Sequence, residues 1–404
     1  MAGAPRWTVA EHRAAVAAAV SPPPVEECLL AAAEGAVLAE DVRAAGPLPA
    51  FDNCAMDGYA LLRADVAAAR PDRPARLVVT ATVAAGGSDP PPLRPRTAQR
   101  VMTGAPVPPG ADTVVEVECT DGGTALVAVH TPRERGANIR LAGEDVGAGA
   151  VVLQAGVRLT PARLALLAAL GRGRVRIVPP PRVLVISTGT ELVAPEAPLR
   201  PGQVRDVNAL LLAGALRRAG ARAETLPAVP DDPRQLRRLV EARAGDCDLI
   251  LTTGGISAGA FEVVKEAFAG RGVRFGAVAM SPGGPQGAGR VGGRPLVALP
   301  GTPVGAFVAF EVFVRPALRA AMGYLHPERR LLSAVTTEPL RSRPGQRHFR
   351  LATLTSAGAV CPCDRRRAHH LSTLAGATGL VELPEDRTLV DAGEPVPVWE
   401  LDPE

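Results

Sequence analysis

The strongest constraint on the fold is an alternation of short apolar runs and helical segments between residues 182 and 323. Apolar runs at residues 183–186, 249–251 and 296–299 predict strands, and the segments at 209–218, after Asp232-Pro233, and at 304–322 predict helices. Strands that are apolar throughout and separated by helices are typical of a parallel sheet covered on both faces. We therefore expect a doubly wound α/β domain with its ligand site at the carboxyl ends of the strands.

Short loops rich in glycine and hydroxyl side chains follow these predicted strands. They read STGTE at residues 187–191, TTGGIS at 252–257 and PGTP at 300–303. Glycine lets backbone N–H groups approach an anion closely, and a following helix that starts at Ile256-Ser257 would point its N-terminus at the same place. Tight turns explain any one of these loops, but several loops at one sheet edge favour a shared anion pocket.

Charged side chains accompany the loops. Glu191, Asp206 and Glu262 lie in the same region, and carboxylates beside a phosphate site indicate a divalent cation such as Mg²⁺. Asp206 also stands just before a predicted helix, so helix capping is an alternative role for it. Lys265 is the one lysine among 45 lysine and arginine residues, which makes it either a retained site residue or a solvated side chain.

The remaining segments predict a multidomain chain. Residues 46–145 contain short β-rich runs between glycines and prolines, which indicates a β-rich insert domain. A capping box at Thr8 and Glu11 opens one helix, a short helical piece is expected at 28–33, and residues 160–171 predict another helix. We expect the first and last to pack together in a discontinuous helical linking domain, residues 1–45 plus 146–178. The α/β domain then spans 179–325, and a C-terminal β-domain spans 326–404.

Composition excludes several classes of function. The net charge is only +4, and no basic run is interleaved with aromatic residues, which argues against nucleic-acid binding. No apolar stretch reaches the ~18 residues of a membrane span, and the N-terminal segment lacks an apolar signal core. The six cysteines are scattered, as is typical of free thiols in a cytoplasmic protein.

A set of motifs occurs along the chain in a fixed order: FDNCAMDGYA (51–60), VMTGAP (101–106), NIR and GED (138–145), STGTEL (187–192), DVN (206–208), TGGIS (253–257) and LPGTP (299–303). Together they resemble the molybdopterin molybdenumtransferases, the MoeA and gephyrin E-domain family. The resemblance covers nearly the whole chain. It implies a central domain similar to MoaB and MogA and a small C-terminal β-barrel.

The resemblance also implies a function. Members of this family insert molybdate into adenylated molybdopterin, cleave the adenylate, release AMP and use Mg²⁺. They are homodimers acting on small molecules, and the molybdopterin adenylyltransferase and molybdoenzyme chaperones are implied as further partners. Carried over to this chain, the catalytic residues are Asp57, Thr103, Asp145, Glu191, Asp206 and Glu262, of which the last three hold the metal. The cofactor-binding residues are Ser187, Thr188, Gly189, Thr253, Gly254, Gly255, Ser257, Lys265, Pro300, Gly301, Arg343 and Arg350.

The chain departs from the family pattern in its charges. It carries Glu262 where the family usually has aspartate, and it reads SPGGP at 281–285 where the family often has KPGKP. Two lysines are thus replaced by Ser281 and Gly284, and the candidates for compensating charge are Arg290, Arg343, Arg347 and Arg350. An active transferase and a divergent paralogue that binds molybdopterin or scaffolds partners both remain open. A nucleotide-processing hydrolase would leave the motifs at residues 51–145 unexplained.

Overall fold

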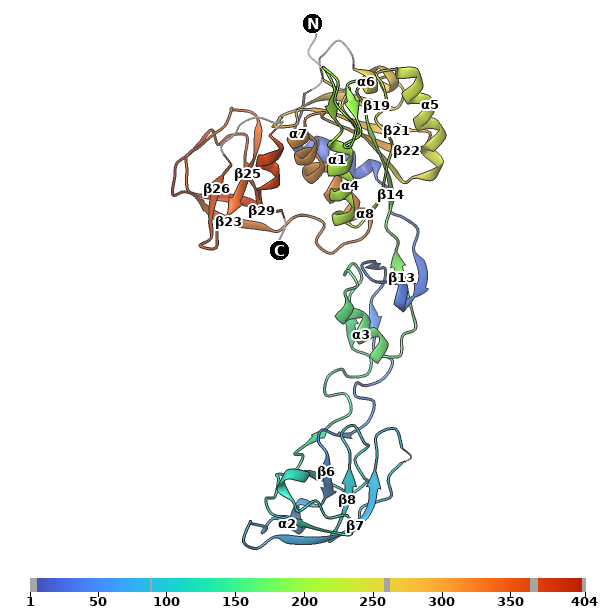
Figure 1. Cartoon of the computed structure of the whole chain (residues 1–404), viewed down its shortest axis with the longest axis vertical. Helices are drawn as coiled ribbons and strands as arrows, with labels where there is room; N and C mark the ends of the chain where they lie inside the picture. The colour runs from blue at the N-terminus through green and yellow to red at the C-terminus, as the bar shows by residue number, and fades with distance from the viewer. Residues whose placement is uncertain (1–5, 88, 258–261, 364–369, 402–404) are drawn as a thin grey trace. The chain divides into compact units, whose positions relative to one another are not determined.

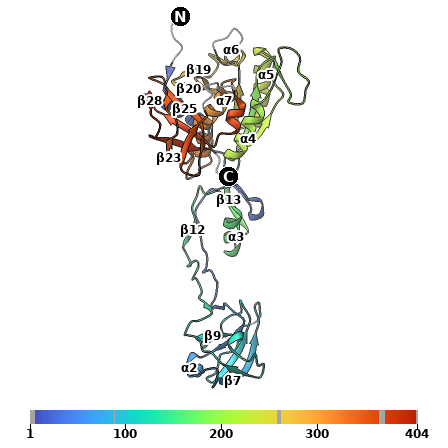
Figure 2. The same ribbon diagram turned by 60° about the vertical axis from the view of Figure 1, so that its left-hand side comes forward.

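The computed structural model describes residues 6–87, 89–257, 262–363 and 370–401. The chain forms two compact units, one comprising residues 1–40, 155–160 and 174–404 (unit 1) and the other comprising 41–154 and 161–173 (unit 2). No helix in the described ranges combines the length and apolarity needed to cross a lipid bilayer. Figures 1 and 2 show the elements of each unit.

The predicted doubly wound domain forms the centre of unit 1. Within the described residues its sheet has seven strands, in the order β1 (Arg6–Trp7), β19 (Val273–Val278), β21 (Pro285–Val291), β22 (Arg294–Leu299), β18 (Leu249–Thr253), β14 (Arg182–Ser187) and β17 (Arg222–Thr225). Strands β22, β18, β14 and β17 are parallel, as predicted, whereas β21 runs antiparallel to both of its neighbours. The glycine-rich β21 was not recognised as a strand because it lacks an apolar run.

Successive residues of the central strands pack on opposite faces of the sheet, because side chains alternate along a strand. Val183 and Val185 join a core with α1 (Val9–Ala19), α4 (Asn208–Ala219), α7 (Pro303–Ala309) and α8 (Arg315–Ala321). Leu184 and Ile186 join a second core with α5 (Pro233–Arg243) and α6 (Val263–Phe268). The predicted helix at 304–322 is present as α7 and α8, joined by the π-helical turn η4 (Phe310–Val314).

The N-terminal helix differs from the prediction in its packing. Its capping box is present, since Glu11 N–H donates to Thr8 Oγ1 and the Glu11 carboxylate accepts from the Thr8 N–H. However, α1 packs against α8, η4 and β21 rather than forming a linking domain with the helix at 160–171. The reason is its apolar face, on which Val9 and Val16 are buried in the core of the α/β domain.

The segments expected to link the domains form strands as well as helix. The antiparallel sheet β2 (Glu26–Leu29), β13 (Arg174–Val178) and β3 (Val37–Leu38) joins two distant parts of the chain. The prediction of a helix at 28–33 is wrong for its first residues, which belong to β2. Only the 3₁₀ turn η1 (Leu30–Ala32) is helical. Pairing with β13 makes residues 26–29 a strand. This contact joins distant parts of the chain, so the local sequence does not predict it.

Unit 2 is β-rich, as predicted. Within its described residues, one sheet has the order β10 (Leu126–Val129), β7 (Ala75–Val83), β8 (Thr97–Val101), β6 (Gly58–Leu61) and β9 (Thr113–Glu116). Strand β5 (Asn53–Cys54) pairs with β11 (Ile139–Arg140), and β4 (Val42–Arg43) pairs with β12 (Val151–Leu153). Its helices are the short α2 (Arg63–Val66) and α3 (Pro161–Ala169), the latter beginning at a proline as the sequence indicates.

The C-terminal segment of unit 1 is a closed barrel. Strands β25 (Arg347–Leu354), β26 (Ala359–Pro362), β23 (Leu331–Thr336), β29 (Pro395–Glu400) and β27 (Gly379–Leu383) pair in turn, and β27 closes the ring on β25. The strand β20 (Met280–Ser281) of the α/β domain adds to β25 through Ser281 and His348. The same segment also contains the short elements β24 (Leu340–Arg341), β28 (Leu389–Val390) and α9 (Leu371–Ala375).

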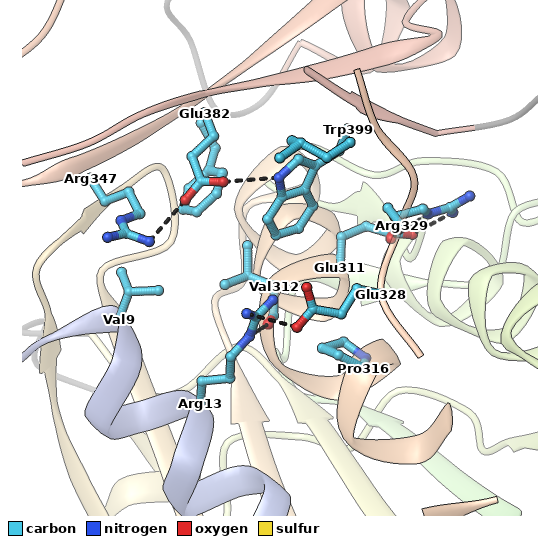
Figure 3. A pocket seen from close by; sticks show the side chains of 12 residues that line it. Val9, Arg13, Glu311, Val312, Pro316, Glu328, Arg329, Arg347, Glu382 and Trp399 are labelled. Atoms are coloured by element: carbon cyan, nitrogen blue, oxygen red, sulfur yellow. Dashed lines mark hydrogen bonds and ion pairs between the residues drawn. The ribbon is translucent and has the colours of Figure 1, made fainter. Parts of the chain in front are cut away.

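Charged side chains join the barrel to the α/β domain around a cavity of about 250 Å³. Figure 3 shows Glu311 of η4 beside Arg329 of the connecting segment, and Trp399 of β29 donating to Glu382. Arg329 Nε and Nη2 each lie 2.9 Å from a Glu311 oxygen, and Arg329 also donates to the carbonyl of Leu401. Since the Glu311 side chain is only 1% exposed, this ion pair is a buried anchor.

A buried histidine supports the helix α1. His12 is 2% exposed, its ring stacks on Trp7 at 5.3 Å between centroids, and it meets the edge of Phe313 at 4.7 Å. Burial, with a smaller contribution from the charge of Arg274, lowers the pKa of His12 from 6.5 to about 4. The folded protein therefore holds this imidazole in its neutral form at neutral pH.

This shift predicts a pH-dependent stability. Between pH 6.5 and pH 4 the unfolded chain binds a proton at His12 that the folded chain does not bind. Stability should thus fall with falling pH through this window, by roughly 3 kcal/mol in total. The variant His12→Phe keeps the ring contacts and should lack this component. Denaturant unfolding followed by the fluorescence of Trp7 and Trp399 at pH 7, 5.5 and 4 measures the difference; parallel curves for the two proteins would contradict it.

Candidate functional site

The predicted loops meet at the carboxyl ends of β14, β18 and β22 and surround one cavity of about 580 Å³. Most of the predicted site residues of unit 1 line it: Ser187, Thr188, Gly189, Glu191, Thr253, Gly254, Gly255, Ser257, Glu262, Pro300 and Gly301. The other described residues that line it are Leu192, Asn208, Asp231, Ile256, Gly283, Pro285 and Thr302. A cavity of this size accommodates a small-molecule ligand.

Asn208 ties the loops together. This side chain is 8% exposed, and its amide nitrogen donates to Thr253 Oγ1 at 3.0 Å and to the Gly301 carbonyl at 2.7 Å. Thr253 Oγ1 in turn donates to the Pro300 carbonyl at 2.8 Å. The Asn208 Oδ1 atom has no partner among the described residues. Sequence reasoning included Asn208 in a motif but did not assign it to the site.

Glycine at position 254 is required by the packing of the loops. A Cβ atom on Gly254, whose φ is +93°, would lie 2.7 Å from the Thr188 carbonyl oxygen. The N–H groups of Thr188, Gly189 and Gly254 already donate to carbonyls of Thr253, Val229 and Leu299. These amides hold the loops to one another, so they do not serve an anion as the sequence suggested. Within the described residues, the N–H groups of Gly255 and Gly301 have no such partner.

The three predicted metal ligands have different surroundings. Glu191 and Glu262 line the cavity, whereas Asp206 does not. Asp206 Oδ1 accepts from Ser187 Oγ at 2.9 Å and from the Ala209 N–H at 3.1 Å, which is the helix-capping role left open by the sequence. Among the described residues no group of three His, Cys, Asp or Glu side chains is arranged to hold a metal.

A fourth carboxylate that the sequence did not indicate also lines the cavity. Asp231 Oδ2 accepts from the Thr190 N–H and from Thr190 Oγ1, both at 3.1 Å, and the Asp231 N–H donates back to Thr190 Oγ1 at 3.1 Å. These bonds hold the loop that carries Glu191. Asp231 directly precedes the Asp232-Pro233 start of α5, and no local sequence pattern marks it as a site residue.

Two expectations around Lys265 do not agree with the structure. The helix after the second loop does not start at Ile256-Ser257: α6 begins at Val263, because Gly255 turns the chain there and its carbonyl accepts from Val264 and Lys265. The Lys265 side chain is exposed and does not line the cavity. It is placed on the solvent side of α6 by the burial of Val263, Val264 and Ala267 on the opposite side.

The arginine-bearing segment of the barrel lines a second cavity, of about 490 Å³, which meets the first at Gly283. Its lining includes Ser281, Arg341, Arg343, His348 and Arg350. Burial is the main cause that lowers the pKa of His348, and the charges of Arg350 and Arg343 act in the same direction. The two predicted arginines therefore face the loop that lacks the family lysines.

The other two candidate arginines are engaged elsewhere. Arg347 pairs with Glu382 at 2.9 Å and Glu385 at 3.0 Å, on the side of β25 that faces the cavity of Figure 3. Arg290 donates to the carbonyls of Gly293 and Ala19. Neither lines the second cavity, so the compensating charge expected from them is not found there.

The remaining predicted residues belong to unit 2. Thr103 donates to Asp57 Oδ1 through its N–H at 2.6 Å and its hydroxyl at 2.7 Å. The backbone bond is the largest cause that lowers the pKa of Asp57, so this exposed carboxylate is ionised at neutral pH. Asp145 is also exposed, on a segment that bonds through its N–H to the Leu48 carbonyl.

Comparison with known proteins agrees with this architecture. Three family models match: the MoeA N-terminal region (domains I and II) at residues 7–171, a probable molybdopterin binding domain at 184–320, and the MoeA C-terminal region (domain IV) at 333–401. Molybdopterin molybdenumtransferase 2 of Mycobacterium tuberculosis is 49% identical over 380 residues, which are 92% of this chain and 94% of that protein. The chain belongs to the MoeA family.

Other members of the MoeA family are more distant in sequence but also match over most of the chain. The molybdopterin molybdenumtransferase of Bacillus subtilis is 33% identical over 89% of this chain and 86% of its own length. A crystal structure of the molybdopterin biosynthesis MoeA protein of Pyrococcus horikoshii matches with a TM-score of 0.83 at 28% identity, covering 98% of this chain and 99% of that chain. Both the resemblance and the fold class expected from the sequence are thereby confirmed.

Proposed function

We propose that this MoeA-family chain inserts molybdate into adenylated molybdopterin in the cytoplasm, with cleavage of the adenylate and release of AMP. The observation that supports this most directly is the cavity in which three glycine- and hydroxyl-bearing loops meet two carboxylates, Glu191 and Glu262. Loops of this kind can bind phosphate groups. The relatives are named molybdopterin molybdenumtransferases, which suggests the substrate.

In this proposal the chain's own residues bind and orient the ligand. Two N–H groups without partners among the described residues face the phosphates: that of Gly255, after β18, and that of Gly301, just before α7. Asn208 and Asp231 hold the loops in position. Arg343 and Arg350 supply positive charge beside Ser281, in place of the missing lysines.

The donor set of the cavity also fits Mg²⁺, which takes one or two carboxylates together with substrate phosphates. Glu191 and Glu262 would hold it, and Asp206 would support the loop through Ser187 rather than bind the metal. When bound, the ion neutralises negative charge on the phosphates.

The test is an assay of AMP release from adenylated molybdopterin with and without molybdate, together with complementation of a strain that lacks molybdenum insertion. AMP release and growth support the proposal. Tight ligand binding without AMP release would instead support the divergent paralogue, for which the absence of lysine at Ser281 and Gly284 is the specific observation. No binding at all would contradict both.

We also propose that the site is completed in a homodimer. Asp57, Thr103 and Asp145 belong to unit 2, whereas the cavity belongs to unit 1, and the resemblance places these residues over the site of the partner subunit. The other implied partners, a molybdopterin adenylyltransferase and molybdoenzyme chaperones, would supply and receive the ligand.

A mixed dimer tests this arrangement. Asp57→Asn and Glu191→Gln homodimers should both be inactive. A heterodimer of the two variants, purified through two different affinity tags, has one site without either substitution and should show about half of wild-type activity. An inactive heterodimer would contradict the shared site, as would a monomer mass by light scattering at micromolar concentration.

A further inference from the structure

The loop at residues 281–284 stands where the two cavities of the site meet. Gly283 lines both of them, with the phosphate-type loops on one side and the arginines on the other. The loop contains no long side chain that could anchor it, since it reads Ser-Pro-Gly-Gly. Its position therefore depends on the contacts that its backbone makes.

A buried glutamine supplies one of these contacts. Gln286 of β21 is 1% exposed, and its amide nitrogen donates to the Gly283 carbonyl at 2.7 Å. Close packing adds a second restraint, because a Cβ atom on Gly283 would lie 3.1 Å from the Gly305 carbonyl oxygen of α7. A third is the bond from the Val278 N–H to the Gly284 carbonyl, also at 2.7 Å.

Strand β21, which carries Gln286, packs against α1, which carries His12. Gln286 Oε1 and His12 Nε2 are both buried, and neither has a geometrically complete hydrogen bond among the described residues. Gln286 Oε1 is an acceptor, and His12 Nε2 can donate when it carries the proton of the neutral imidazole. The presence of Gln286 raises the pKa of His12, against the larger lowering effect of burial, as expected for neighbouring side chains.

The aromatic side chains around His12 restrain its ring more firmly than the backbone contacts restrain the loop at 281–284. Its ring lies between Trp7 and Phe313, so the imidazole has little freedom to rotate. A side chain held on this scaffold can orient the amide of Gln286, and the amide then orients the Gly283 carbonyl.

We infer that His12 and Gln286 are positioning residues that hold the loop at 281–284 in the geometry required for ligand binding. This inference rests on the proposed function of the cavity. It gives the N-terminal helix α1 a role in the site, although His12 itself lines neither the first nor the second cavity. Ser281 and Gly284 stand where the family often has lysines, so the loop of this chain has only its backbone contacts to hold it.

The experiment compares Gln286→Leu and His12→Phe, which remove the hydrogen-bonding groups and keep the apolar volume. Gln99→Leu is the matched control. Gln99 of β8 is also fully buried, donates to the Pro91 carbonyl at 2.8 Å and leaves its Oε1 atom without a partner among the described residues. A loss of stability common to all three variants therefore reports only the loss of a buried amide or imidazole.

Two readouts separate positioning from packing. Hydrogen exchange at residues 278–284 should become faster in Gln286→Leu and His12→Phe and remain unchanged in Gln99→Leu. The dissociation constant for adenylated molybdopterin should rise about tenfold in Gln286→Leu. In the double variant, His12→Phe should add nothing further, because it acts through Gln286.

Unchanged exchange, or an unchanged dissociation constant despite faster exchange, would overturn the inference. Independent effects that add in the double variant would also overturn it. If wild-type protein binds no adenylated molybdopterin, the proposed function has failed, and the positioning role that depends on it falls as well. Binding by wild type and by all variants alike contradicts only the positioning role.

Discussion

Glu191→Gln is expected to reduce the rate of AMP release by about 10²- to 10³-fold while leaving the fold intact. The substitution keeps the size of the side chain and removes its charge. Glu191 lines the cavity and is exposed to it, so its carboxylate is available to the ligand and to the proposed Mg²⁺. The measurement is single-turnover AMP release at saturating adenylated molybdopterin, with circular dichroism to verify folding.

A matched control lies nearby in the chain, after the short strand β15 (Leu192–Val193) that follows Glu191. Glu196 is exposed but does not line the cavity, and Glu196→Gln should retain wild-type rates. Gly189→Ala tests the same carboxylate without changing its charge, because a Cβ atom at 189 would lie 2.7 Å from both Glu191 oxygens and displace them. This variant should also be slow. Unchanged AMP release in Glu191→Gln would remove the residue from the mechanism.

Glu311→Gln should destabilise unit 1 by about 3–5 kcal/mol, because it leaves two buried guanidinium groups without their carboxylate. Arg329 bonds Glu311 through two nitrogens at 2.9 Å, and Arg315 lies 3.7 Å from it. Burial, with the charge of Arg329, lowers the pKa of Arg315 to about 10, and the negative charge of Glu311 opposes this shift. Both tryptophans of the chain, Trp7 and Trp399, lie in unit 1, so denaturant unfolding followed by tryptophan fluorescence reports on it.

The neighbouring pair provides the comparison. Arg13 and Glu328 lie 3.2 Å apart at the same cavity, with the Glu328 side chain 62% exposed (Figure 3). Glu328→Gln should cost less than about 1 kcal/mol, because water solvates both charges when the pair is broken. Equal effects of the two substitutions would show that burial of Glu311 does not make its ion pair an anchor.

Much of the architecture could be predicted because it depends on local pattern. The parallel strands of the α/β domain are apolar throughout, and their loops carry glycine and hydroxyl residues in recognisable order. These patterns sufficed to place eleven of the predicted residues around one cavity. Strand β21 was missed because its glycines hide the alternation that normally marks a strand.

The contributions of single side chains were less predictable. Asp206 has the sequence context of both a metal ligand and a helix cap, and the hydrogen bonds from Ser187 and Ala209 show which oxygen is already used. Lys265 stands at helical spacing from Glu262, but the direction of its side chain depends on which face of α6 is buried. The spacing of residues in the sequence shows which side chains are neighbours on a helix. It does not show which face of the helix packs against the rest of the protein.

The sequence by itself determined the apolar parallel strands of the α/β domain, the loops of the site and the membership of the family, because these are encoded in residues close together in the chain. Only the tertiary structure decided that α1 packs beside β21, that Asn208 joins Thr253 to Gly301, and that Arg343 and Arg350 face the loop at 281–284. Each of these contacts joins residues far apart in sequence. Their energies come from burial and from hydrogen-bond geometry, which exist only once the chain has folded.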